Sequence, residues 1–141
     1  MRQVFIDTNV FIDFMAHRGE FYGPAAILVS LARNEKINLL VSSLSFATAS
    51  YILQSHHRHS HEQVVREFED FIALCHITSV GHDTIIRAIS SAFVDIEDAM
   101  QHYSALSADA DYIVTRNKTD FSSSAIPVYS PQEMLDVLLN T

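Results

Sequence analysis

The sequence is poor in the residues on which several common classes of protein depend. A single cysteine in 141 residues excludes a disulfide framework, and we expect Cys75 to behave as a small buried hydrophobic side chain. Three glycines leave no glycine-rich phosphate loop, which excludes the usual dinucleotide-binding and Walker fingerprints. No run of eighteen apolar residues is present, so no membrane span is expected. The N-terminus lacks the regions of a signal peptide, which predicts a cytoplasmic protein.

Basic residues are also scarce. Nine lysines and arginines stand against seventeen aspartates and glutamates, which leaves a formal net charge of −8. Because a surface that binds nucleic acid is normally basic, this balance disfavours a broad nucleic-acid interface and allows only a narrow one. Carboxylates gathered to bind cations would account for part of the acidic excess.

Short apolar runs alternate with helical patterns along the whole chain. We expect strands at residues 4–6, 37–41, 76–80, 111–115 and 126–130, and helical segments around residues 11–15, 24–34, 44–52, 63–72, 85–93, 94–106 and 131–138. Asp83 is the expected cap of the segment that carries Ile85, Ile86, Ile89 and Phe93. Unalternating apolar strands separated by helices are typical of a parallel sheet between helix layers. The pattern therefore predicts one α/β domain over residues 1–141, with a mostly parallel sheet of about five strands.

Polar side chains follow the first and fourth of these strands. Asp7 comes directly after the first strand, and the segment TRNKTDF after the fourth strand supplies Asn117 and Asp120. Asp95 and Asp98 begin the helix that leads into the fourth strand. Sites in open parallel sheets form beyond the carboxyl ends of the strands, so we expect these side chains to meet at one edge.

Carboxylates that meet in this way suit a hard divalent cation such as Mg²⁺ or Mn²⁺. Without a cation they would repel one another and raise one another's pKa, whereas a bound metal can activate a water and stabilise a phosphate undergoing displacement. Each residue also has a purely structural interpretation. Asp7 can form an Asx-turn before a helix capped by Thr8 or Asn9, and Asp95 and Asp98 can favour the positive end of their own helix.

Three stretches resemble the PIN-domain family, including the VapC-type toxin nucleases. They are VFIDTNVFIDF, DIEDAMQHYSALSADADYIVTRNKTDF and IPVYSPQEML, and they extend from about Val4 to Leu138. The resemblance implies a three-layer α/β/α sandwich and a Mg²⁺- or Mn²⁺-dependent endoribonuclease that hydrolyses RNA phosphodiester bonds with a metal-activated water. It also implies a possible antitoxin partner and a homodimer.

The resemblance assigns roles to particular residues. It places Asp7, Asp98, Asp120 and Asn117 in an acidic catalytic pocket, with Asp7, Asp98 and Asp120 as metal ligands and Asp95 in reserve. Polar neighbours of these residues are the candidate substrate contacts, namely Thr8, Asn9, Arg116 and Lys118. For Arg116 and Lys118, simple solvation of a loop is an equally good interpretation.

One departure from the family concerns the helix after the second strand. Many PIN nucleases carry a glutamate there, whereas the segment SSLSFATASYIL contains no acid and places Thr48 at the corresponding position. A hydroxyl adds no charge, so a second metal would be held less tightly. The chain could rely on Asp95 or Asp120 instead, could use a single metal, or could have lost activity.

Two other functions compete with the nuclease interpretation. A catalytically weak PIN-like module that binds RNA or protein is favoured by the missing glutamate and the negative charge. A Mg²⁺-dependent phosphohydrolase acting on small phosphate esters could use a similar sheet. The remaining features predict structure. The tract HHRHSH is expected in a polar connection, where contact with RNA or a partner is the alternative. His102 is expected in a solvated position beside the site, with service as a general base as the alternative. The aromatic residues at helical spacings are expected in the core: Tyr51, Phe68, Phe71 and Tyr103.

Overall fold

The computed structural model describes residues 1–140, and in this part of the chain five strands form one sheet. Their order across the sheet is β3-β2-β1-β4-β5, and every neighbouring pair is parallel. The strands are β1 (Gln3–Ile6), β2 (Asn38–Ser42), β3 (Cys75–Thr78), β4 (Tyr112–Val114) and β5 (Val128–Tyr129). The expected parallel α/β sheet is therefore confirmed.

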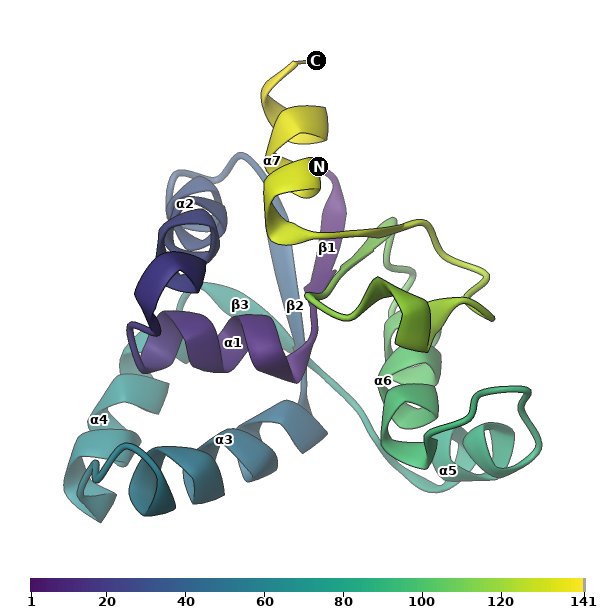
Figure 1. Cartoon of the computed structure of the whole chain (residues 1–141), viewed down its shortest axis with the longest axis horizontal. Coiled ribbons are helices and arrows are strands. Elements are labelled where there is room, and N and C mark those ends of the chain that lie inside the picture. The colour runs from purple at the N-terminus through teal and green to yellow at the C-terminus, as the bar shows by residue number, and fades with distance from the viewer. Residues whose placement is uncertain (141) are drawn as a thin grey trace.

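Helices cover both faces of the sheet (Figure 1). The α-helices are α1 (Thr8–Met15), α2 (Tyr22–Arg33), α3 (Ser43–Ser55), α4 (His61–Ile72), α5 (His82–Ile89), α6 (Ile96–Ser107) and α7 (Pro131–Leu139). Two short 3₁₀ helices, η1 (Gly19–Phe21) and η2 (Lys118–Phe121), interrupt the connections. Figure 1 shows α1 to α4 and α7 on one side of the strands and α5 and α6 on the other. The chain thus has the expected three-layer α/β/α architecture.

Alternation along the strands divides the core between these two layers. Val4 and Ile6 of β1 point into the larger cluster, which the side of α1 to α4 and α7 completes. Phe5 of β1 points the other way, where it packs with Ala105 of α6 and Phe121 of η2. Both faces of β1 are fully buried, as its continuous apolar run predicts.

The structure corrects two predictions about the helices. Tyr51 of α3 is 69% exposed and does not belong to the core. Helix α5 begins at His82 rather than at a cap on Asp83, because Thr84 Oγ1 accepts a hydrogen bond from the Gly81 N–H at 3.4 Å and closes the first turn one residue earlier. The helix ends at Ile89, so Phe93 lies outside it.

Candidate active site

The site begins where β1 ends beside β4. These two strands lie at the point where the strand order reverses, which is where open α/β sheets place their ligands. The Asp7 N–H donates to the Val114 carbonyl at 2.9 Å, which continues the β1–β4 pairing by one residue. Asp7 is extended, and its side chain accepts the Thr8 N–H, so Asp7 itself is the N-cap of α1 in place of Thr8 or Asn9.

Four donors hold the Asp7 carboxylate, which is only 6% exposed. Its Oδ1 accepts from the Thr8 N–H at 2.9 Å and from Gln101 Nε2 at 3.1 Å. Its Oδ2 accepts from Thr115 Oγ1 at 2.9 Å and from Asn9 Nδ2 at 3.4 Å. Burial raises the pKa of Asp7, these hydrogen bonds lower it, and the charge of Asp120 raises it further. The hydrogen bonds therefore fix the carboxylate in position, and the net effect of its surroundings is a raised pKa.

Gln101 of α6 is a residue that the sequence analysis missed. It is 1% exposed, and its Nε2 contacts Asp7 Oδ1, Thr8 Oγ1 at 3.0 Å and Ser45 Oγ at 2.8 Å. Its Oε1 accepts a short hydrogen bond from Ser42 Oγ at the end of β2. Gln101 thereby joins α6 to the start of α1, the end of β2 and the start of α3. Its place one turn after Asp98, on the same helical face, is the only signal of this role in the sequence.

Asp98 faces the same cavity as Asp7. This cavity of about 290 Å³ is lined by Asp7 after β1, by residues of α1, α3 and α6, by Arg18, and by the segment after β4. The pKa of Asp98 is raised to about 7, first by burial and then by the charges of Asp7, Asp95, Asp120 and Glu97. Near neutral pH this carboxyl is poised between its neutral and charged forms.

The other predicted site residues lie in different places. Thr8, Asn9, Arg116 and Asn117 line the cavity with Asp7 and Asp98. Three others are not among its described lining residues: Asp95, Lys118 and Asp120. The Asp95 side chain accepts the Asp98 N–H as the N-cap of α6, and Lys118 Nζ lies 2.9 Å from Glu133 Oε1. Asp120 is exposed on η2, from where its charge acts on both Asp7 and Asp98.

Two arginines share one buried carboxylate at the mouth of the cavity. Asp13 is 1% exposed, and its oxygens lie 2.7 Å from Arg18 Nε and 2.7 Å from Arg116 Nε. Arg116 Nη2 adds a second bond to Asp13 at 3.2 Å. Both arginines line the cavity, so Asp13 fixes positive charge beside the acidic pair. Neither Asp13 nor Arg18 stood out in the sequence.

Comparison with known proteins identifies the family. A family model described as PIN domain matches residues 3–119. The chain belongs to the PIN-domain family. A search of curated proteins gave no match. Among solved structures, the PIN-domain chain is similar to VapBC2 from Rickettsia felis bound to a DNA fragment of its promoter, with 16% identity, 91% of this chain and 98% of that chain covered, and a TM-score of 0.64.

Two further structures share this PIN fold. A toxin-antitoxin complex from Klebsiella pneumoniae has 20% identity, covers 91% of this chain and 97% of its own, and has a TM-score of 0.67. The sarcin-ricin loop cleaving toxin VapC20 of Mycobacterium tuberculosis has 14% identity, covers 78% and 86%, and has a TM-score of 0.60. At these identities the likeness establishes the fold.

The departure from the family pattern on α3 has a counterpart on α6. Thr48 lines the cavity, and its Oγ1 donates a hydrogen bond to Glu97 Oε1 at 3.3 Å. Glu97 lines the same cavity next to Asp98. An acidic side chain of α6 therefore lies beside Thr48 in the cavity. Glu97 has no signal of its own in the sequence, because it lies between Asp95 and Asp98 where an acidic residue is expected at the start of a helix.

The side chains of this site offer oxygen donors of the kind that Mg²⁺ and Mn²⁺ prefer. Within residues 1–140 no three His, Cys, Asp or Glu side chains lie close enough together to hold a metal ion by themselves. Mg²⁺ is commonly held by one or two carboxylates together with waters and substrate phosphate, so such a cluster is not required. The pKa of Asp98 is raised by burial and by the charges of four other carboxylates, and a bound cation would offset that repulsion. The donor set thus fits a divalent metal.

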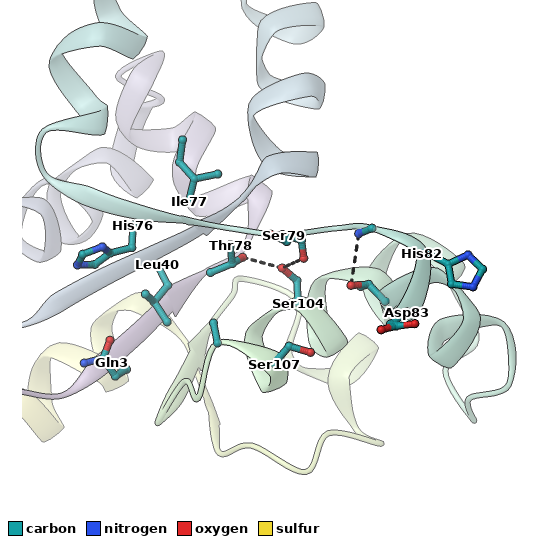
Figure 2. Close-up of a pocket in the computed structure, with 13 residues that line it drawn as sticks. Gln3, Leu40, His76, Ile77, Thr78, Ser79, His82, Asp83, Ser104 and Ser107 are labelled. Carbon is teal, nitrogen blue, oxygen red and sulfur yellow. Dashed lines mark hydrogen bonds between the residues drawn. The ribbon is translucent and has the colours of Figure 1, made fainter.

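A larger cavity lies elsewhere on this PIN domain. It measures about 720 Å³ and lies beside β2, β3, α5 and α6, where Thr78 and Ser104 share a hydrogen bond of 2.6 Å (Figure 2). Ser104 also donates to the Ser79 carbonyl at 2.8 Å. Asp83 is the single acid among the described residues that line it. This cavity lacks the paired carboxylates of the site at Asp7, although it is more than twice as large.

Proposed function

We propose that this PIN domain is a Mg²⁺- or Mn²⁺-dependent endoribonuclease and the toxin of a toxin-antitoxin pair. The observation that supports this most directly is the placement of Asp7 and Asp98 in one cavity, with the pKa of Asp98 raised to about 7 and two fixed arginines alongside. Carboxylates that hold a cation next to guanidinium groups that hold phosphate are the parts that phosphodiester hydrolysis needs.

Each side chain has a separate task in this proposal. Asp7 and Asp98 would hold the metal, Asn117 and Glu97 line the same cavity, and the charge of Asp120 acts on both carboxylates. When bound, the metal supplies a nucleophilic water and neutralises charge on the phosphate. Gln101 and Thr115 keep the Asp7 carboxylate in a single orientation. Arg18 and Arg116 orient the RNA phosphate, because Asp13 holds both guanidinium groups in place.

The experiment that tests this proposal is cleavage of single-stranded RNA by the purified protein. With Mn²⁺ the protein should cut internally, and EDTA should stop the reaction. Asp7→Asn and Asp98→Asn should each remove most of the activity, whereas Asp136→Asn, an exposed carboxylate on α7, should not. Hydrolysis of a small phosphate ester without cleavage of RNA would show a phosphohydrolase instead.

A catalytically weak binding module is the second candidate. The observation that favours it is the absence of an acid from α3, where Thr48 stands. The approach of Glu97 to Thr48 weighs against it, because the charge lost from α3 is present on α6. Binding of RNA without cleavage of any substrate, over a range of metals, would support this candidate.

Partners follow from the same proposal. The VapBC2 structure and the Klebsiella complex contain antitoxins, which supports an antitoxin for this chain. A homodimer is supported by α5, whose Ile85, Ile86 and Ile89 are 37%, 51% and 66% exposed. No helix within residues 1–140 has the length and apolar character needed to cross a membrane. We place the protein in the cytoplasm, where its single cysteine would stay reduced.

A further inference from the structure

Phe21 is an exposed aromatic residue next to the candidate active site. It ends η1, and 41% of its surface is accessible to solvent. The guanidinium carbon of Arg116 lies 4.0 Å from the centre of its ring, which is a close cation–π contact. Asp13 holds the same guanidinium through Nε and Nη2. Arg116 is therefore held between the Phe21 ring and the Asp13 carboxylate.

This pair connects the active-site cavity to a second one. A cavity of about 410 Å³ is lined by Phe21 and Pro24 on one side and by Pro131 and Gln132 at the start of α7 on the other. Arg116 lines both this cavity and the one that contains Asp7 and Asp98. A molecule that occupies both cavities must therefore pass over the Arg116 guanidinium.

We propose that the cavity between η1 and α7 is a nucleobase-binding subsite, in which a base of the RNA strand stacks on Phe21 while a neighbouring phosphate contacts Arg18 and Arg116. This inference rests on the proposed ribonuclease function. It names the part of the substrate that the protein recognises beyond the phosphate undergoing cleavage.

The chemistry of the cavity favours a base as its occupant. Proteins bind single-stranded RNA by stacking bases on aromatic rings and on guanidinium planes, and this cavity supplies both. Phe21, Pro24 and Pro131 provide apolar surface, whereas Glu20 and Gln132 provide groups that can hydrogen-bond with a base edge. The Glu20 carboxylate repels phosphate, which keeps the RNA backbone on the arginine side. In a chain with net charge −8, this is a narrow contact of the kind that the composition allows.

The chain contains no tryptophan, so a tryptophan introduced at position 21 can report directly on stacking of a base. Phe21→Trp introduces a single tryptophan, which can still stack and whose fluorescence can be excited separately from that of the five tyrosines. A twelve-residue single-stranded RNA in EDTA, where no cleavage occurs, should quench its fluorescence. Ile72→Trp, at a position of similar exposure (48%) on α4, should show no quenching. Equal quenching in the two variants, or none in either, would overturn the proposal.

A second measurement tests the stacking energy. Phe21→Leu should weaken binding of this RNA by about 5- to 150-fold, the usual contribution of one base stacked on an aromatic ring to affinity. Phe21→Tyr keeps an aromatic ring and should bind the RNA as tightly as the wild type. RNAs that lack the base at one nucleotide provide a further test. At one nucleotide position, the missing base should weaken binding to the wild type by a similar factor. The same RNA should bind to Phe21→Leu as tightly as the complete RNA does. Melting temperatures of all variants should agree, because Phe21 is partly exposed.

The outcomes separate this subsite from the proposed function. If the wild type cuts RNA with Mn²⁺ but Phe21→Leu binds RNA as tightly as the wild type, the ribonuclease proposal stands and the subsite is wrong. In that case the cavity would have another occupant, such as a protein helix. If the wild type neither binds nor cuts RNA, both proposals are wrong.

Discussion

Asp98 links the stability of this PIN domain to pH. The pKa of its carboxyl is raised from 3.8 to about 7 in the folded protein, so between these values the folded state holds a proton that the unfolded state has lost. The metal-free protein should therefore lose stability as the pH rises from about 4 to about 7, and the cost should be fully present above pH 7. Asp98→Asn removes this ionisation and should raise the melting temperature of the metal-free protein at pH 8.

Thermal denaturation of both proteins in EDTA between pH 5 and pH 8 measures this effect. The difference in melting temperature should be small at pH 5 and should grow to pH 8. The comparison cancels His102, whose pKa is lowered by burial and by Arg87 and whose contribution to stability is lost as the pH falls below 6.5. In the wild type, Mn²⁺ at 100 times its Kd should restore about 2.7 kcal/mol. A constant difference across the pH range would contradict the assignment.

Glu97 and Thr48 are hydrogen-bonded, so the single negative charge of this pair can be moved from one residue to the other by mutation. Glu97→Gln should weaken Mn²⁺ binding by about 10-fold, the lower range for groups that act around a metal. Thr48→Glu alone places a carboxylate beside Glu97, and the repulsion should limit any gain. The double variant Thr48→Glu/Glu97→Gln should return the affinity to that of the wild type. Titration calorimetry of the four proteins decides this, and equal affinities throughout would exclude Glu97 from the site.

At the scale of elements, the Gln101 amide of α6 makes the hydrogen bonds that join this helix to the sheet at the candidate active site. Gln101→Leu would remove one buried hydrogen-bond partner from each of four residues, Asp7, Thr8, Ser42 and Ser45, and we expect a loss of about 2–4 kcal/mol in the free energy of unfolding. Gln54→Leu, on the exposed side of α3, should change it by less than about 0.5 kcal/mol. Urea denaturation provides the values. A Gln101 variant as stable as the wild type would show that water or rearrangement satisfies these groups.

The order and type of most elements could be predicted from the sequence, because apolar runs and helix caps are local signals. The sequence also indicated Asp7 and Asp98, since polar residues at strand ends and helix starts are unusual enough to notice. It could not reveal Gln101, Asp13 or Arg18, because their roles depend on which elements meet in space. The sequence likewise does not tell what covers helix α5. Its isoleucines follow a helical period, but a period does not tell whether this chain or another one covers the face.

For the molecule as a whole, this face of α5 makes a prediction about assembly. If it joins two copies of the chain, Ile89→Asp should convert a dimer into a monomer, because a carboxylate would be buried without a partner. Ile27→Asp, on an exposed position of α2, should leave the assembly unchanged. Sedimentation velocity distinguishes the two. A dimer that persists in the Ile89 variant would place the interface elsewhere.

The position of β1 in the middle of the sheet has a consequence for the order of events during synthesis. Thr115, which binds the Asp7 carboxylate, is translated 108 positions after Asp7. One edge of β1 stays unpaired until β4 has left the ribosome, and such distant pairing makes folding slow. While these positions are translated, the nascent chain carries the first part of the candidate site without the second. The ribonuclease activity that we propose therefore cannot begin before β4 and Thr115 have left the ribosome.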